Sequence, residues 1–233
     1  MAITISFSKG AGLLSYKCIT LRGDEDIFVM KKLGASFYSQ GNVVAIASAL
    51  LGKLLVTEFD GLLTAGRIVE TEAYNGIADK ASHAYGGRRT KRTETMYAAG
   101  GTAYVYLCYG IHHLFNVVTN TKDIPHAILV RGIEPVKGIP VMLQRMRKEK
   151  LDHAVGRGPG NVSKALGISV GHTSKSLLGS ELYIADDGCI IGKAQMGISA
   201  RIGVDYAAED ALLPYRFYVK DNPYVSGKKS LKH

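Results

Sequence analysis

Two glutamates and one tyrosine alternate along the stretch "RIVETEAY", residues 67–74, and their spacing could bring carboxylates and an aromatic ring together. In a β-strand, side chains two positions apart point to the same face. A strand here would place four side chains on one face: Ile68, Glu70, Glu72 and Tyr74. The residues between them are small or apolar and suit a core. We therefore predict that the carboxylates and the ring face a site.

The chemistry that such carboxylates offer is proton transfer, because a positioned carboxylate can act as a general base or stabilise a developing positive charge. Two glutamates at i and i+2 lie side by side on one strand, so they cannot easily flank a bond that is to be cleaved. We therefore predict that one glutamate acts and that the other is structural. The alternative is a solvated Glu72 on an edge strand, with Tyr74 covering the core.

Further aromatic residues follow along the chain and could complete a flat binding pocket. His83 comes shortly after Tyr74, and the segment "YVYLCYG" holds Tyr104, Tyr106 and Tyr109. Phenol groups need polar partners or a flat ligand on which to stack. The alternatives are a histidine that forms hydrogen bonds within a loop and a tyrosine-rich strand that packs at the edge of the core.

Positive charge is concentrated in the segment "RRTKR", which lies between the two aromatic stretches. It contains four cations: Arg88, Arg89, Lys91 and Arg92. The whole chain has 29 basic and 20 acidic residues, which gives a net charge of +9. This balance predicts an anionic partner, with nucleic acid as the first choice and an acidic membrane surface or the ribosome as alternatives. The cluster is interpreted either as a phosphate-binding loop or as a solvated face.

Other kinds of site find little support in the sequence. The adjacent His112 and His113 would point to opposite faces of a strand, and the three cysteines show no CxxC spacing, so no metal is predicted. The glycine-rich "GRGPGNVSKALGI" lacks the nucleotide-binding patterns and is predicted to enter a helix through an Asn161 cap. The longest apolar run has about half the length of a membrane span, so no membrane anchor is expected, and the spacing of the cysteines indicates an intracellular protein.

Hydrophobic periodicity predicts the elements that position these residues. We expect helices at "NVVAIASALLG" and "GIPVMLQRMRKEKL", strands at "KLLVTEF", "RIVETEAY" and "AILVRGIEP", and a hairpin with Tyr109 and Gly110 at its tip. Short strands are predicted at "ELYIAD", "CIIG", "ARIGV" and "RFYV". The predicted fold class is α+β: a single mixed domain with a curved, mainly antiparallel sheet, a protruding β-hairpin and flanking helices. This domain should span 37–226, between an N-terminal extension or irregular lead-in at 1–36 and a basic tail at 227–233.

Several of these segments, in this order, resemble the motifs of one known family: "RIVETEAY", "ASHAYGG", "GTAYVYLCYG" followed by "HHLFNVV", "ILVRGIEP", "GPGNVSKALGI" and "RFYV". From about residue 37 to about residue 226 the chain is similar to the alkyladenine, or 3-methyladenine, DNA glycosylases. The resemblance implies a monofunctional enzyme without a cofactor that flips an alkylated or deaminated purine out of duplex DNA. It would hydrolyse the N-glycosidic bond and so start base excision repair.

The resemblance also implies a role for each residue of the site. Glu72 would be the general base that activates water. Tyr74 and His83 would stack on opposite faces of the flipped base, and Tyr106 would close the pocket. Asn116 would line the pocket and obstruct the amino group of normal guanine.

Two more residues would contact the DNA: Tyr109 would fill the gap left in the duplex, and Arg131 would lie near the phosphate of the flipped nucleotide. The chain departs from the family pattern in the loop at "KRTET" and "AAGG", where a proline-containing turn is expected. We expect a monomer that acts in the cytoplasm or nucleoid of a bacterium, or in a eukaryotic nucleus.

The alternative is a nucleic-acid-binding module without catalysis, because "GTAYVYLCYG" loosely resembles the base-stacking strand of RNA-recognition domains. Such a module has no need for Glu72.

Overall fold

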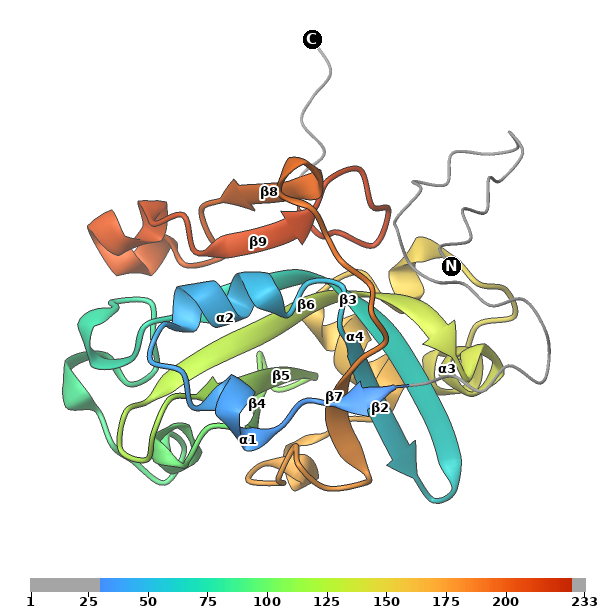
Figure 1. The fold of residues 1–233 in the computed structure, drawn as a ribbon, viewed down its shortest axis with the longest axis horizontal. Helices are drawn as coiled ribbons and strands as arrows, with labels where there is room; N and C mark the ends of the chain where they lie inside the picture. Colours follow the sequence, from blue (N-terminus) through green and yellow to red (C-terminus); the bar gives the residue numbers. More distant parts are fainter. Residues whose placement is uncertain (1–29, 228–233) are drawn as a thin grey trace, which may run out of the picture.

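The computed structural model describes residues 30–227, and this part of the chain folds around one large sheet (Figure 1). The basic tail predicted at 227–233 lies outside the described residues apart from Gly227, and so does most of the lead-in predicted at 1–36. Of that lead-in, Lys31 and Lys32 form the short strand β1, which pairs with β7 at one end of the sheet.

The sheet is antiparallel in every named pairing and follows the order β1-β7-β2-β3-β6-β5-β4. Strand β9 joins this path from the side, where it pairs with β3 and with β8. The bounds after β1 are β2 Leu54–Phe59, β3 Leu62–Tyr74, β4 Thr102–Cys108, β5 His112–Thr119, β6 His126–Lys137, β7 Leu182–Asp186, β8 Met196–Ser199 and β9 Arg216–Val219. The predicted α+β class with a curved, antiparallel sheet is confirmed (Figure 1).

Among residues 30–227 there are four α-helices: α1 Ala35–Tyr38, α2 Val43–Ala49, α3 Ile139–Met146 and α4 Pro159–Leu166. The Asn42 side chain caps α2, which packs on β3 and β6 (Figure 1).

The predicted Asn161 cap of α4 is wrong. The helix begins after Gly158 with a proline in its first turn, and Asn161 lies inside it, where its amide donates to the Arg157 carbonyl. No helix in the described part of the chain is long and apolar enough to cross a membrane.

The long strand β3 carries the two glutamates and has a neighbour on each side of them. It pairs with β6 along most of its length, with β2 in its first half, and with β9 beside Glu70 and Glu72. Both glutamates therefore lie on an internal strand, and both are fully buried. This arrangement contradicts the alternative of a solvated Glu72 on an edge strand.

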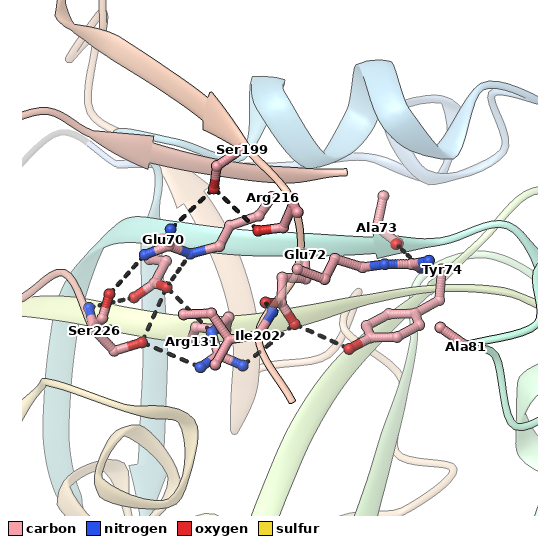
Figure 2. Close-up of polar contacts among 12 residues, drawn as sticks. Glu70, Glu72, Ala73, Tyr74, Ala81, Arg131, Ser199, Ile202, Arg216 and Ser226 are labelled. Carbon is pink, nitrogen blue, oxygen red and sulfur yellow. Dashed lines mark hydrogen bonds and ion pairs between the residues drawn. The ribbon is translucent and has the colours of Figure 1, made fainter. Parts of the chain in front are cut away.

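The pairing of β3 with β6 shifts register on both sides of Glu70, between Ile68 and Glu70 and again before Thr71. A β-bulge of this kind interrupts the two-residue alternation of side chains. Ile68 consequently packs in the main hydrophobic core together with Ala73. The prediction that Ile68 shares the face of the glutamates is wrong for this reason, whereas Glu70 and Glu72 lie side by side as expected (Figure 2).

Strands β4 and β5 form the predicted hairpin, in which Cys108 and His112 are the last pair before the turn. Tyr109 and Gly110 lie in this turn with φ angles of 50° and 73°. The left-handed region is easy for glycine and uncommon for a tyrosine. The side chain of Tyr109 is 91% exposed, so the hairpin presents an aromatic ring at its tip.

The long loop between β3 and β4 contains three short 3-10 turns, Gly76–Ala78, Tyr85–Gly87 and Glu94–Tyr97. Its centre is fastened by the Thr93 hydroxyl, which donates to the Arg88 carbonyl over 3.1 Å. These turns and this bond give the loop a defined course without the proline-containing turn that the family resemblance leads one to expect.

The chain after β7 follows the sequence prediction only in part. The strands predicted at "CIIG" and "ARIGV" are wrong, since β8 lies between these two segments and neither forms a strand. Short apolar runs of this kind do not distinguish a strand from an irregular segment. The strand predicted at "RFYV" is β9, and its pairing with β3 brings the irregular connection after β8 to the buried glutamates.

Candidate active site

Glu72 lies near the end of β3, and its carboxylate is held from three directions (Figure 2). The Ile202 N–H donates to Oε1 over 2.7 Å. The Tyr74 hydroxyl and Arg131 Nη1 donate to Oε2 over 2.9 and 3.2 Å. These donors come from β3, from β6 and from the connection between β8 and β9. Because hydrogen bonds to a charged acceptor are directional and favour the ionised form, Glu72 is a pre-oriented carboxylate.

Glu70 lies beside Glu72 and has a different set of partners (Figure 2). Its Oε1 accepts bonds from Arg131 Nε at 3.1 Å, Arg216 Nε at 2.7 Å and Ser226 Oγ at 3.0 Å. Its Oε2 accepts a bond from the Ser226 N–H at 2.6 Å. Glu70 thus ties β3 to β6, to β9 and to the chain that follows β9. Such a fully engaged carboxylate suits a structural role, as predicted for one of the two glutamates.

Burial raises the pKa of Glu72 above its ordinary value, because a low-dielectric environment penalises the ionised carboxylate. Arg131, the Ile202 N–H and Tyr74 act in the opposite direction, and Glu70 adds to the increase. A base whose pKa lies closer to neutrality accepts a proton more readily than an exposed glutamate does. The surroundings of Glu72 therefore suit general-base chemistry.

The aromatic residues predicted to hold a ligand line one pocket, and Tyr74 connects this pocket to Glu72. The pocket contains about 320 Å³ of space between atoms, part of which is open to solvent. Its polar and aromatic lining consists of Tyr74, His83, Tyr104, Tyr106, Asn116 and Tyr206. The structure thus brings together all four residues of the predicted base pocket, and it adds two tyrosines to them.

His83 is fixed at the pocket wall by its Nδ1 atom, which lies 2.9 Å from the Tyr104 hydroxyl. Its ring meets the ring of Tyr106 edge to face, with centroids 4.6 Å apart and an interplanar angle of 75°. Burial lowers the pKa of His83 to about 4, and the nearby Arg92 and Arg88 add to the decrease. The imidazole is therefore neutral at physiological pH, and the pocket offers an uncharged aromatic ring.

Asn116 lies on β5 opposite Tyr104 and is almost fully buried. Its Nδ2 atom donates to the carbonyls of Tyr104 and Leu114 over 3.1 and 3.2 Å. Because these bonds use both hydrogens of the amide, the side chain cannot rotate freely. Asn116 is therefore a fixed part of the pocket wall.

Arg89 differs from the other cations of the "RRTKR" segment because it already has two acidic partners. Its guanidinium pairs with Glu94 and with Asp123, each at 2.7 Å. Both pairs lie at the surface, where an ion pair contributes little to stability. They nevertheless neutralise the charge of Arg89, so this residue is less available to a phosphate than its position in the cluster indicates.

The other three cations of the segment differ in what surrounds them. Arg92 lies over the ring of Tyr106, with Cζ 5.3 Å from the ring centroid. This contact places a positive charge at the wall of the pocket. The segment is therefore not a uniform patch: Arg88, Lys91 and Arg92 are all exposed, and Arg92 also contacts a ring of the pocket.

Arg131 lies in the interior and not at a surface that DNA could reach directly. Its Nε and Nη1 atoms donate to the two glutamates, and Nη2 donates to Ser226 Oγ over 3.2 Å. The side chain is only 10% exposed. The resemblance implies a contact with the phosphate of the flipped nucleotide, which stays a prediction. The observed geometry favours a role in holding Glu70 and Glu72.

Several contributors to this cluster cannot be found from sequence patterns. Ile202 takes part only through its backbone N–H, which no side-chain pattern reveals. Arg201 and Asp79 form a buried ion pair behind Tyr74, although they lie in irregular segments far apart in the sequence. The only available signal for Arg216 is its place at the start of the predicted strand "RFYV".

Comparison with known proteins gives a consistent result. A profile of the methylpurine-DNA glycosylase (MPG) family matches residues 36–223. A protein of Clostridium perfringens named "Putative 3-methyladenine DNA glycosylase" is 43% identical over 205 residues, which cover 84% of this chain and 100% of that protein. Proteins with the same name in Chlamydia pneumoniae and Bacillus cereus are 46% and 44% identical, and the matches cover 82% and 83% of this chain and 96% and 98% of those proteins.

The family match covers the whole of the predicted domain except its last few residues, and it includes the buried glutamates, the aromatic pocket and the hairpin. The relatives match over nearly their full length. The resemblance that the motifs indicate is thereby confirmed, and the alternative of a binding module without catalysis is set aside. The chain belongs to the methylpurine-DNA glycosylase family and is a DNA glycosylase, a hydrolase that acts on N-glycosyl bonds.

Proposed function

We propose that the protein is a monofunctional glycosylase that flips alkylated or deaminated purines out of duplex DNA and so starts base excision repair. The observation that carries this proposal is a buried, pre-oriented carboxylate behind a pocket of aromatic rings. The names of the relatives and the net charge of +9 also support it. We further propose that the protein acts as a monomer inside the cell, where its substrate is found.

In the proposed mechanism Glu72 activates the water that replaces the base. Breaking the bond leaves positive charge on the sugar, which a nearby carboxylate stabilises while it takes a proton from the water. Among the described residues, Oε1 of Glu72 accepts one hydrogen bond, from Ile202, whereas Oε2 accepts two. A carboxylate oxygen can accept two hydrogen bonds, so we place the water at Oε1. Arg131 is then a positioning residue.

The aromatic pocket is proposed to hold the flipped base. Tyr74 and His83 would stack on its two faces, and Tyr106 would close the pocket. Stacking on an aromatic side chain contributes about 1–3 kcal/mol per base. The neutral state of His83 favours cationic lesions such as 3-methyladenine, because an imidazolium would repel them. The fixed wall at Asn116 would obstruct the amino group of normal guanine.

Tyr109 is proposed to fill the gap that the flipped nucleotide leaves in the duplex. Tyr109→Ser should therefore slow single-turnover excision and weaken retention of lesion DNA, because nothing would replace the unstacked base. The exposed ring supports no part of the fold, so thermal unfolding should stay as in the wild type. Rapid-quench kinetics on a duplex with one lesion measures the effect. A wild-type excision rate in this variant would show that the wedge lies elsewhere.

Arg88 and Lys91 are proposed to contact DNA phosphates. Replacing either residue by Ala should reduce the slope of log affinity against log salt concentration by about 0.9. Arg89→Ala should change the slope much less, because Glu94 and Asp123 already neutralise that charge. Fluorescence anisotropy of a labelled duplex at several salt concentrations measures the slopes. Equal changes in all three variants would mean that Arg89 leaves its acidic partners when DNA binds. Arg92 and Arg131 stay predicted phosphate contacts.

The proposed function is tested with an end-labelled duplex that contains a single hypoxanthine or a single alkylated purine. After incubation with the protein, alkaline cleavage of abasic sites should give one shortened strand from each lesion duplex and none from undamaged DNA. Borohydride added during turnover should trap no protein–DNA adduct, because water and not a lysine is the proposed nucleophile. Binding without strand shortening on every lesion would contradict the proposed activity.

A further inference from the structure

Behind the pocket, Arg201 and Asp79 form an ion pair that the proposed mechanism does not use. Their side chains are 0% and 1% exposed. Arg201 Nη1 and Nη2 donate to the two carboxylate oxygens of Asp79 over 2.5 and 2.8 Å. Two parallel bonds between an arginine and a carboxylate fix the relative orientation of both groups. The pair therefore makes a rigid connection between two segments that are far apart in the sequence.

Both members of the pair also bind backbone groups around the pocket. Arg201 donates to the carbonyls of Ala73, at the end of β3, and of Asp210, over 2.9 and 3.1 Å. Asp79 accepts bonds from two N–H groups of its own turn, at 2.9 and 3.0 Å. The pair thus fastens the end of β3, the start of the pocket loop and the connection between β8 and β9 to one another.

Two groups beside Arg201 donate hydrogen bonds to the two Oε atoms of Glu72. Its Cζ atom lies 4.9 Å from the ring centroid of Tyr74 and 5.3 Å from that of Tyr215. Tyr74 donates to Oε2 of Glu72, and the residue next to Arg201, Ile202, donates to Oε1 (Figure 2). Among the described residues, no backbone-to-backbone hydrogen bond fastens 200–203. The placement of the Ile202 N–H therefore depends on the side chain of Arg201.

We propose that Arg201 is a positioning residue for the base Glu72: paired with Asp79, it holds the Ile202 N–H against Oε1 and supports the Tyr74 ring at the pocket wall. The inference rests on the proposed role of Glu72. Without Arg201, the irregular segment 200–203 is free to move away from β3. The buried carboxylate then loses one of its three donors, and its ionised form is less stable.

The proposal predicts a change at Glu72 while its other charged and titratable neighbours stay in place. These neighbours are Glu70 and Tyr74 on β3, Arg131 on β6, Arg216 on β9 and Tyr206 after β8. The pKa of Glu72 is already above its ordinary value through burial. Loss of the Ile202 donor should raise it further, because that bond favours the ionised form.

The experiment is a direct titration of Glu72 by NMR in protein labelled with ¹³C at the glutamate carboxyl groups. The resonance of Glu72 is assigned by its absence in Glu72→Gln. In Arg201→Gln the midpoint of this titration should move upward by about one pH unit or more, because the carboxylate loses both a backbone donor and the nearby positive charge of Arg201. The acid limb of single-turnover excision should move in the same direction. Arg201→Lys, which keeps the charge but loses the two-pronged contact, should give a smaller displacement.

A milder variant covers the case in which Arg201→Gln does not fold. Tyr215→Leu leaves the ion pair intact and removes one of the two rings that confine the guanidinium, so it should move the Glu72 titration upward by less. Tyr218→Leu is the matched control. Tyr218 lies on β9, which Tyr215 directly precedes, and its ring contacts the guanidinium of Arg216 at 4.6 Å, so an equivalent contact is lost at an arginine that does not hold the Ile202 N–H. This control should leave the titration of Glu72 unchanged.

The outcomes separate this inference from the proposed function, because the titration does not depend on excision. A folded Arg201→Gln or Tyr215→Leu protein with an unchanged Glu72 titration overturns the inference, even if excision slows, since a purely structural role lowers only the folded fraction. An upward displacement in a protein whose wild type excises no lesion supports the positioning role and contradicts the glycosylase mechanism. Equal displacement in the Tyr218→Leu control would also overturn the inference.

Discussion

Glu72→Gln is expected to lower the single-turnover rate of purine excision by about 10²- to 10⁴-fold, the usual cost of losing a general base. Glutamine keeps the size of the side chain and can still accept the Ile202 N–H bond. It is neither an anion nor a base, so stabilisation of the sugar cation and activation of water are lost together. Binding of lesion DNA, measured separately by anisotropy, should stay within a few-fold of the wild type, because the pocket and the hairpin tip are unchanged.

Glu70→Gln is the matched control, because Glu70 lies on the same strand and shares Arg131 with Glu72. Its partners are structural, and a neutral side chain would leave buried donors poorly paired. We expect the free energy of unfolding to fall by about 1–3 kcal/mol. The excision rate of the folded protein should fall far less than in Glu72→Gln. If folded Glu70→Gln were inactive while Glu72→Gln kept its activity, the base would be Glu70.

Arg131→Met is expected to lower the free energy of unfolding by about 3–5 kcal/mol, because it leaves two buried carboxylates without their shared cation. The loss depends on pH. Burial already raises the pKa of Glu72 and Arg131 opposes the increase, so without Arg131 that pKa lies further above its unfolded value and the folded state binds the proton more tightly. The defect should therefore be largest above the folded pKa of Glu72 and smaller at acidic pH. Urea denaturation at pH 8 and pH 5 measures the difference.

Arg67→Met provides a control for burial alone. Arg67 forms a similar two-pronged, nearly buried pair with Asp187, away from the glutamates. Its loss should destabilise the protein but leave the excision rate of the folded fraction and the titration of Glu72 unchanged.

If Arg131→Met were as stable as the wild type, the shared guanidinium would not be needed for the fold, and its role would be confined to orienting Glu72.

The sequence predicts the local features of the site well. The alternation of Glu70, Glu72 and Tyr74 depends only on the period of a strand, and the hairpin tip at Tyr109 depends on two adjacent strand patterns with almost no spacer. Both predictions are confirmed by the structure. The prediction for Ile68 is wrong because of a β-bulge. The bulge depends on the register between β3 and β6, which the sequence of one strand does not contain.

Features that depend on distant segments could not be predicted from the sequence. The pairing of β9 with β3 brings Arg216 beside Glu70, and the irregular connection after β8 supplies the Ile202 N–H to Glu72. A backbone N–H donor can come from any type of residue, and an isolated arginine in an irregular segment belongs to no repeating sequence pattern. Neither can therefore be recognised in the sequence. The family resemblance identifies Arg131 as important but does not reveal that its guanidinium joins two buried carboxylates.

The late arrival of β9 also matters while the chain is being synthesised. Arg216 follows Glu72 by 216 − 72 = 144 positions, and at about 5–20 residues per second the ribosome needs about 7–30 seconds to make that stretch. During this time the edge of β3 that β9 later covers is open, and open edges invite pairing with other nascent chains. Until then Glu70 lacks Arg216 and Glu72 lacks the Ile202 N–H, and carboxylates with an incomplete set of partners oppose such pairing, because burying their charge in a foreign sheet is costly. The same carboxylates that serve the mature site thus protect the unfinished sheet from aggregation.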